Sequence, residues 1–158
     1  MISATNSRLQ ELLILHEGLS LTAYRCTAKK LTIGIGHNLE ANPIPGLGPG
    51  SAITRERAME ILTEDLQACI NGIRRHLPWV ENLSEVRQAV LIDMTFNLGL
   101  WGLLRFKNFL ASLQDGGPAT DAEHMFASRW AYQVDDGPGK KFGRADRLAQ
   151  MITTGEWA

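Results

Sequence analysis

Several features that mark particular protein classes are scarce in this sequence. The chain has two cysteines, Cys26 and Cys69, among 158 residues, which excludes a disulfide-rich scaffold and fits a reducing compartment. Its 16 Lys and Arg residues nearly balance its 17 Asp and Glu residues, and they form no basic stripe that would favour nucleic acid. No Gly-rich phosphate loop, zinc-type Cys/His spacing or calcium loop is present, so neither a metal nor a nucleotide cofactor is expected.

Long apolar runs are also missing. Residues 1–7, Met-Ile-Ser-Ala-Thr-Asn-Ser, contain no stretch of signal-peptide or membrane-anchor length, so we expect no export signal and no stable membrane association. The overall composition, 44% hydrophobic and 21% charged residues, is typical of a globular protein that can bury a core.

The most informative residue is Glu17, which closes a predicted amphipathic helix over residues 6–17. Leu9, Leu12 and Leu13 share one face of that helix, and Gly18 can supply its C-terminal cap. A carboxyl group in the last turn lies beside the negative end of the helix dipole. A Glu that is protonated near neutral pH can act as a general acid, so this position predicts a sugar-cleaving site.

A small hairpin is predicted directly after this helix. Residues 21–25 and 31–36 read as strands on either side of the polar turn 26–30, which places Cys26 and Thr32 in one hairpin. Gly34 and Gly36 weaken the second strand. Such glycines mark a bulge or the close approach of a backbone or ligand, and a saccharide is one such ligand.

The rest of the chain is predicted to be almost wholly helical. A helix from Thr54 to His76, about 35 Å long at 1.5 Å per residue, is long enough to connect two lobes. Further helices are predicted over 84–98, 106–113, 120–130 and 144–153. Helical spacing predicts core positions for Cys69 and for the aromatic residues Phe96, Trp101, Phe106, Phe109, Phe126 and Trp130.

The expected fold class is therefore α+β within a single domain, 1–158. It comprises a small β-containing lobe (18–53), a connecting helix (54–78) and a larger helical lobe (79–158) on which the first helix packs.

Six short motifs follow one another along nearly the whole chain. They are His16-Glu17-Gly18, Thr32-Ile33-Gly34-Ile35-Gly36-His37, Phe96-Asn97-Leu98-Gly99, Ser128-Arg129-Trp130, Gly143-Arg144-Ala145-Asp146-Arg147 and Thr154-Gly155-Glu156-Trp157. Their joint order resembles the phage-type lysozymes (endolysins) of glycoside hydrolase family 24, in the T-even-type branch.

This resemblance implies a lysozyme-like fold and a muramidase. Such an enzyme hydrolyses the β-1,4 bond between N-acetylmuramic acid and N-acetylglucosamine in peptidoglycan. It further implies a monomer that accumulates in the host cytoplasm and reaches the wall through a membrane lesion made by a holin.

The catalytic pattern of the family is a glutamate, an aspartate and a threonine, which here fall on Glu17, Cys26 and Thr32. The middle position departs from the pattern, because a thiol replaces the second carboxylate of the usual template. Glu17 is expected to protonate the leaving oxygen, and Thr32 to hold a water. For Cys26 three roles remain open: a hydrogen-bonding partner of that water, a thiolate base or nucleophile, and a spacer of similar size.

Three further residues are expected to support the site. Arg144 matches the family position whose guanidinium contacts the catalytic glutamate, Gly34 allows close approach, and His37 either holds the small lobe together or tunes Glu17.

Two rival functions remain. A lytic transglycosylase needs one acid and no water nucleophile, and a catalytically dead lysozyme-like protein would bind glycan without cutting it. A Cys26/His37 cysteine hydrolase is disfavoured because no local nucleophile signature accompanies the pair.

Overall fold

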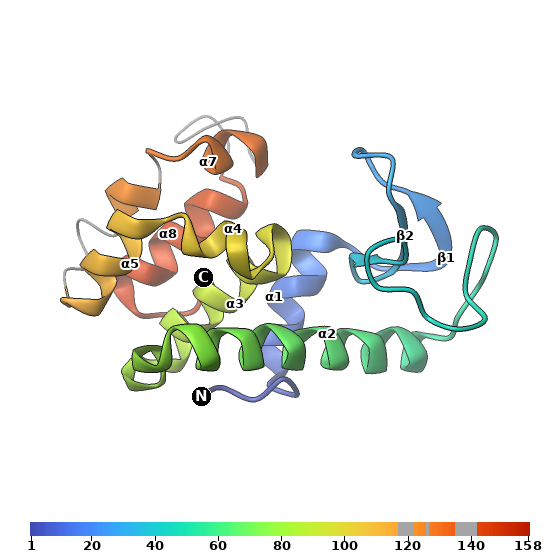
Figure 1. Cartoon of the computed structure of the whole chain (residues 1–158), viewed down its shortest axis with the longest axis horizontal. Coiled ribbons are helices and arrows are strands. Elements are labelled where there is room, and N and C mark those ends of the chain that lie inside the picture. The colour runs from blue at the N-terminus through green and yellow to red at the C-terminus, as the bar shows by residue number, and fades with distance from the viewer. Residues whose placement is uncertain (117–121, 126, 135–141) are drawn as a thin grey trace. The chain divides into compact units, whose positions relative to one another are not determined.

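A computed structural model describes residues 1–116, 122–125, 127–134 and 142–158 (Figure 1). Helices and one small antiparallel sheet make up its regular structure, which confirms the predicted lysozyme-like α+β class. Contacts divide the chain into two compact units. Residues Ser3–Ala68 form the first, here called the sheet unit, and Met1–Ile2 with Cys69–Ala158 form the second, the helical unit.

The sheet unit begins with helix α1 and continues into the sheet and the first part of helix α2. The bounds are α1 Ser7–Glu17, β1 Ser20–Arg25, β2 Leu31–Gly34, β3 His37–Asn38 and α2 Arg55–His76. The strands lie in the order β1-β2-β3, and each pairs with the next in antiparallel fashion. Helix α2 supplies residues to both units.

Local chemistry explains the ends of α1. The side chain of Asn6 accepts a hydrogen bond from the backbone N–H of Leu9 at 3.1 Å and so caps the N-terminus. Gly18, with φ of 75°, ends the helix directly after Glu17 and donates its N–H to the carbonyl of Ile14. Glu17 therefore lies in the last turn, as predicted.

The predicted hairpin is confirmed, but its second strand is shorter than expected. Strand β2 ends at Gly34, because Gly34 and Gly36 both adopt positive φ, 66° and 67°. The chain turns there and returns as β3, with Ile33 opposite His37.

The core of the sheet unit joins its helices to β2. Ile33 and Ile35 are fully buried together with apolar side chains of α1 and α2. These are Leu9, Leu13, Ala58, Ile61, Leu62 and Leu66. Their burial fixes the hairpin relative to the end of α1, which positions the candidate site.

The helical unit holds the remaining elements. They are the 3-10 helix η1 Pro78–Asn82 and the helices α3 Glu85–Leu98, α4 Leu100–Leu104, α5 Lys107–Gln114, α7 Arg129–Val134 and α8 Arg144–Thr154. Helix α3 is buried nearly all round between Val86 and Thr95, as expected for a central helix, and packs against α4 and α8 (Figure 1).

The predicted helix 120–130 is wrong as one continuous element. Residues 122–125 are helical, and a break at Ala127 and Ser128 separates them from α7. The Ser128 hydroxyl donates to the carbonyl of Met125 at 2.6 Å and accepts from the N–H of Ala131 at 3.4 Å, which caps a new helix. Residues 120, 121 and 126 lie outside the described residues.

The expected aromatic core is confirmed in part. Phe109 and Trp130 are buried, and Phe96 and Phe106 are half-buried, whereas Trp101 is 72% exposed. Trp101 lies on the short helix α4, which the sequence did not predict, and its ring meets the edge of His76 at 5.4 Å between centroids. Cys69 is half-buried, and Phe126 lies outside the described residues.

No helix among the described residues is both long enough and apolar enough to cross a membrane.

Candidate active site

The carboxylate of Glu17 lies against the backbone of Gly36. A Cβ atom built on Gly36 would stand 2.9 Å from Glu17 Oε2 and 3.1 Å from Glu17 Cβ and Cγ, which no real side chain tolerates without movement. The glycine therefore allows the hairpin to approach the end of α1. Glu17 itself is half-buried.

Cys26 begins the tight turn between β1 and β2. The N–H of Lys29 donates to the carbonyl of Cys26 at 2.7 Å, and the N–H of Cys26 donates to the carbonyl of Lys30 at 3.0 Å. Between these bonds Lys29 adopts the left-handed conformation, with φ of 60°. The turn thus folds back over the thiol.

This turn stabilises the thiolate form of Cys26. The pKa of Cys26 is lowered, chiefly because the backbone N–H of Lys30 donates to its sulfur. The backbone N–H of Ala28 and the hydroxyl of Thr32 act in the same direction, while partial desolvation opposes them. Cys26 is half-buried and thus partly accessible to solvent.

Thr32 is buried next to this thiol, and its Oγ1 donates to the carbonyl of Lys30 at 3.0 Å. A hydroxyl carries one proton, so Thr32 donates either to that carbonyl or to a Cys26 thiolate. A neutral Cys26 thiol can instead donate to Thr32 Oγ1. The protonation state of Cys26 and the orientation of the Thr32 hydroxyl are therefore linked.

Tyr24 belongs to the same group, although the sequence analysis did not select it. It lies directly opposite Thr32 in the β1-β2 pair, and side chains opposite each other share one face of a sheet. Its pKa is raised by desolvation and, to a smaller extent, by the negative charges of Cys26 and Glu17. The signal available in the sequence was the position of Tyr24, two residues before Cys26 and within the predicted strand 21–25.

His37 occupies a structural position in the sheet unit. Its Nδ1 lies 2.7 Å from Oδ2 of Asp65 on α2, and its Nε2 lies 2.8 Å from the carbonyl oxygen of Asn42. Both partners are acceptors, so the doubly protonated ring satisfies both. The hydrogen bond that His37 donates to the Asp65 carboxylate is the main reason why the pKa of His37 is raised, and partial burial opposes it.

The two glycines of the hairpin face different surroundings. A Cβ on Gly34 would meet Ala58 and Ile53 at 3.6 to 3.7 Å, which is ordinary contact with the side of α2. Gly36 is the glycine that faces Glu17. The structure thus brings Gly36, rather than Gly34, to the carboxylate.

Arg144 begins α8 in the helical unit and is buried there with Asp93 of α3. Its Nε donates to Asp93 Oδ1 at 2.9 Å, and its Nη2 to the Asp93 carbonyl at 3.4 Å. The two side chains are 8% and 0% exposed. Asp93 was not singled out from the sequence, and the expected contact between Arg144 and Glu17 stays a prediction.

A family model described as phage lysozyme matches residues 15–145, which include Glu17, Cys26, Thr32, His37 and Arg144. The chain belongs to the phage lysozyme family. The resemblance predicted from the six motifs is thereby confirmed.

Three curated proteins are similar to this phage lysozyme family member. The pre-baseplate central spike protein Gp5 of Enterobacteria phage T4 is 28% identical, over 95% of this chain and 28% of that protein. The endolysin of Bacillus phage PZA is 31% identical, over 72% of this chain and 41% of that protein. The probable T4-type lysozyme 1 of Dictyostelium discoideum is 26% identical, over 94% and 95% of the two chains. The chain thus matches less than half the length of the first two relatives and nearly all of the third.

Proposed function

We propose that this protein is a lysozyme that hydrolyses the β-1,4 bond between N-acetylmuramic acid and N-acetylglucosamine in peptidoglycan. The observation that carries the proposal is the packing of the Glu17 carboxylate on Gly36, in the unit that also holds the hydrogen-bonded thiol of Cys26. Membership of the phage lysozyme family supports it, as does the similarity to a T4-type lysozyme of nearly equal length.

In this proposal Glu17 is the general acid. It gives its proton to the glycosidic oxygen as the bond to the anomeric carbon breaks, which is the role of the acid in glycoside hydrolysis. Gly36 leaves room for the carboxylate at this position, because a Cβ there would come within 2.9 Å of Oε2.

Cys26 and Thr32 position the attacking water, and Cys26 accepts its proton. Water adds to the anomeric carbon and loses a proton to the Cys26 thiolate, a form that the Lys30 and Ala28 N–H groups favour by lowering the pKa of the thiol. Thr32 then has a hydroxyl that can turn between the sulfur and the carbonyl of Lys30. Tyr24, opposite Thr32, adds a second hydroxyl on the same face.

The supporting roles follow from the same geometry. His37 holds β3 to α2 through Asp65, and Gly34 adopts the positive φ with which β2 ends. Arg144, fixed by Asp93, is proposed to steady the carboxylate of Glu17.

The biological role proposed is that of a monomeric endolysin that causes host cell lysis. It would accumulate in the host cytoplasm, pass through a holin lesion and then act on the wall. The similarity to the endolysin of Bacillus phage PZA supports this role.

A lytic transglycosylase is the second candidate, and the thiol at position 26 favours it. That reaction needs one acid, and the muramic acid O6 replaces water as the nucleophile. Hydrolysis leaves reducing muramic acid ends, whereas transglycosylation leaves anhydro-muramic acid ends, so the products distinguish the two reactions.

The experiment is turbidity clearing of outer-membrane-permeabilised Gram-negative cells, with the released muropeptide ends identified by mass. Glu17→Gln should lose about a hundredfold to ten-thousandfold in rate, the usual contribution of a general acid. Glu11→Gln, an exposed carboxylate on the same helix, is the matched control and should keep the rate. Full activity of Glu17→Gln would overturn the proposal, and so would a lack of cutting by the wild type.

Cys26→Asp, Cys26→Ser and Cys26→Ala define the part of the thiol. If Asp preserves hydrolysis while Ser and Ala lose it, Cys26 takes a chemical part in water attack. Equal rates and products in all four proteins would make Cys26 a bystander. Anhydro ends would move the assignment to a transglycosylase.

A further inference from the structure

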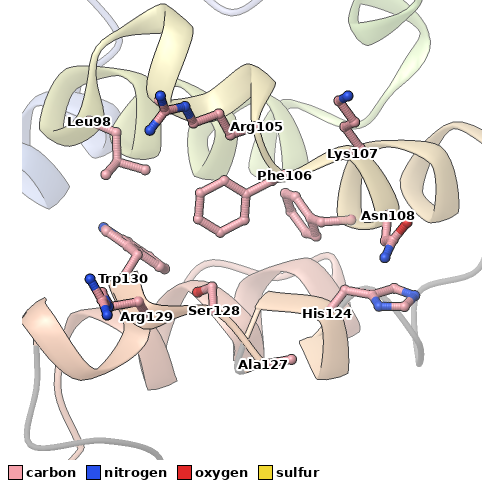
Figure 2. Close-up of a pocket in the computed structure, with 12 residues that line it drawn as sticks. Leu98, Arg105, Phe106, Lys107, Asn108, His124, Ala127, Ser128, Arg129 and Trp130 are labelled. Carbon is pink, nitrogen blue, oxygen red and sulfur yellow. The ribbon is translucent and has the colours of Figure 1, made fainter.

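The helical unit contains a pocket of about 440 Å³ outside the elements that carry Glu17, Cys26 and Thr32. It lies between α4 and α5 on one side and the segment 122–125 with the start of α7 on the other (Figure 2). This volume falls in the range of small-molecule sites.

Three aromatic rings form the apolar part of the pocket. Phe106 meets Phe109 edge-on at 6.3 Å and Trp130 edge-on at 6.1 Å between ring centroids. The indole N–H of Trp130 donates to Asn97 Oδ1 at 2.8 Å, and Trp130 and Phe109 are 4% and 1% exposed, so these two rings pack behind Phe106. Phe106 is half-buried, which leaves part of its ring available to a ligand.

Positive charge is concentrated around these rings. Arg105, Lys107 and Arg129 line the pocket and are exposed, and none of its described lining residues is acidic. Within the described part of the chain, no carboxylate forms an ion pair with any of the three. Exposed cations beside an apolar surface favour an anion that carries an apolar body.

Figure 2 shows how the polar side chains are distributed around the pocket. Arg105 and Arg129 lie at one end of the pocket, Asn108 and His124 lie at the other, and the ring of Phe106 stands between them. Lys107 points away from the pocket. The two arginines share one end of the pocket, and their planar guanidinium groups match a carboxylate.

We propose that this pocket binds a small apolar carboxylate, with the carboxylate between Arg105 and Arg129 and an aromatic or branched body against Phe106, behind which Phe109 and Trp130 pack. This site goes beyond the proposed cleavage of glycan and does not depend on it. The same chemistry occurs in a free aromatic acid and at the C-terminus of a peptide.

The test is a titration of the whole protein, followed through the indole N–H resonance of Trp130 by NMR. The probes are 3-phenylpropionate, the neutral 3-phenylpropanol and the cationic 3-phenylpropylammonium. We expect saturable shifts with the carboxylate. The other two probes should bind at least about tenfold more weakly, because a tenfold difference in affinity corresponds to one modest charge-assisted hydrogen bond. N-Acetylphenylalanine, which resembles a peptide end, should bind more tightly than 3-phenylpropionate if the occupant is a peptide terminus.

Variants distinguish binding in this pocket from nonspecific electrostatic attraction to the protein surface. Arg105→Gln and Arg129→Gln should each weaken carboxylate binding severalfold and leave 3-phenylpropanol unchanged. Lys107→Gln, the matched control because its side chain points away, should bind like the wild type. The proposal is overturned if 3-phenylpropionate gives no saturable shift, if the three probes bind equally, or if Lys107→Gln loses as much as the arginine variants.

Discussion

The two units each hold an ion pair between a basic side chain and a helical aspartate, but the two pairs differ in chemistry. In the sheet unit His37 meets Asp65 at 2.7 Å, and in the helical unit Arg144 meets Asp93 at 2.9 Å. Asp93 is fully buried, whereas Asp65 is 24% exposed. An imidazole can release its proton near neutral pH and a guanidinium cannot. Stability that depends on pH near neutrality is therefore expected in the sheet unit, because its pair contains the imidazole.

The largest effect is expected from breaking the buried pair of the helical unit. Asp93→Asn leaves the Arg144 guanidinium without its buried counter-charge and should lower the free energy of unfolding by about 3 to 5 kcal/mol. Urea unfolding followed by circular dichroism measures this. Glu85→Gln, which removes an exposed carboxylate in the first turn of the same helix α3, should cost less than about 1 kcal/mol. Equal losses of stability in the two variants would show that the pair of Asp93 and Arg144 contributes no more to the free energy of unfolding than an exposed charge does.

The second effect separates Gly36 from Gly34 within the sheet unit. Both adopt positive φ, so Ala at either position should cost about 1 to 2 kcal/mol of stability. Gly36→Ala alone also pushes on Glu17 Oε2, so we expect a further loss of about a hundredfold in lytic rate. Unfolding curves measure the loss of stability, and turbidity clearing measures the loss of lytic rate. Equal activity in the two variants would remove the positioning role of Gly36.

The third prediction concerns the pH response of the sheet unit. The folded-state pKa of His37 is raised, so its contribution to stability is complete below the unfolded value of about 6.5 and disappears as pH rises through the folded value. Urea unfolding between about pH 5 and pH 9 should therefore show stability falling above neutrality. Asp65→Asn should flatten this fall, and an unchanged profile in that variant would contradict the assignment.

The smallest expected effect is a difference in alkylation rate between the two thiols, one in each unit. Cys26 and Cys69 are both half-buried, but backbone N–H groups lower the pKa of Cys26. Iodoacetamide at neutral pH should label Cys26 about three to ten times faster than Cys69, as followed by peptide mass. Thr32→Val, which removes one donor, should narrow the difference. Faster labelling of Cys69 would show that exposure outweighs the hydrogen bonds.

Periodicity and capping residues predicted much of this fold. The structure confirms Gly18 as the C-terminal cap of α1, and the end of α2 lies at His76 as expected. The break at Ser128 was missed because its serine can close one helix and open the next without a proline or glycine to mark it. Trp101 was placed in the core because helical spacing does not reveal which side of a short helix faces the solvent.

The site was predictable as a set of positions but not as a set of contacts. The spacing of Glu17, Cys26 and Thr32 selected residues that the structure places in one unit. The partners Asp65 and Asp93 come from distant parts of the chain, so no local pattern pointed to them. Tyr24 was missed because its role depends on the register of β1 against β2.

The turn at residues 26–30 has a consequence for how the sequence can drift. Two of the groups that hold the Cys26 sulfur are main-chain N–H groups, of Lys30 and Ala28, and every residue except proline carries one. Substitutions at these positions keep the donors, whereas the insertion or deletion of one residue would move them. Selection on this thiol would therefore act on the length of the turn and leave most of its side chains free to vary.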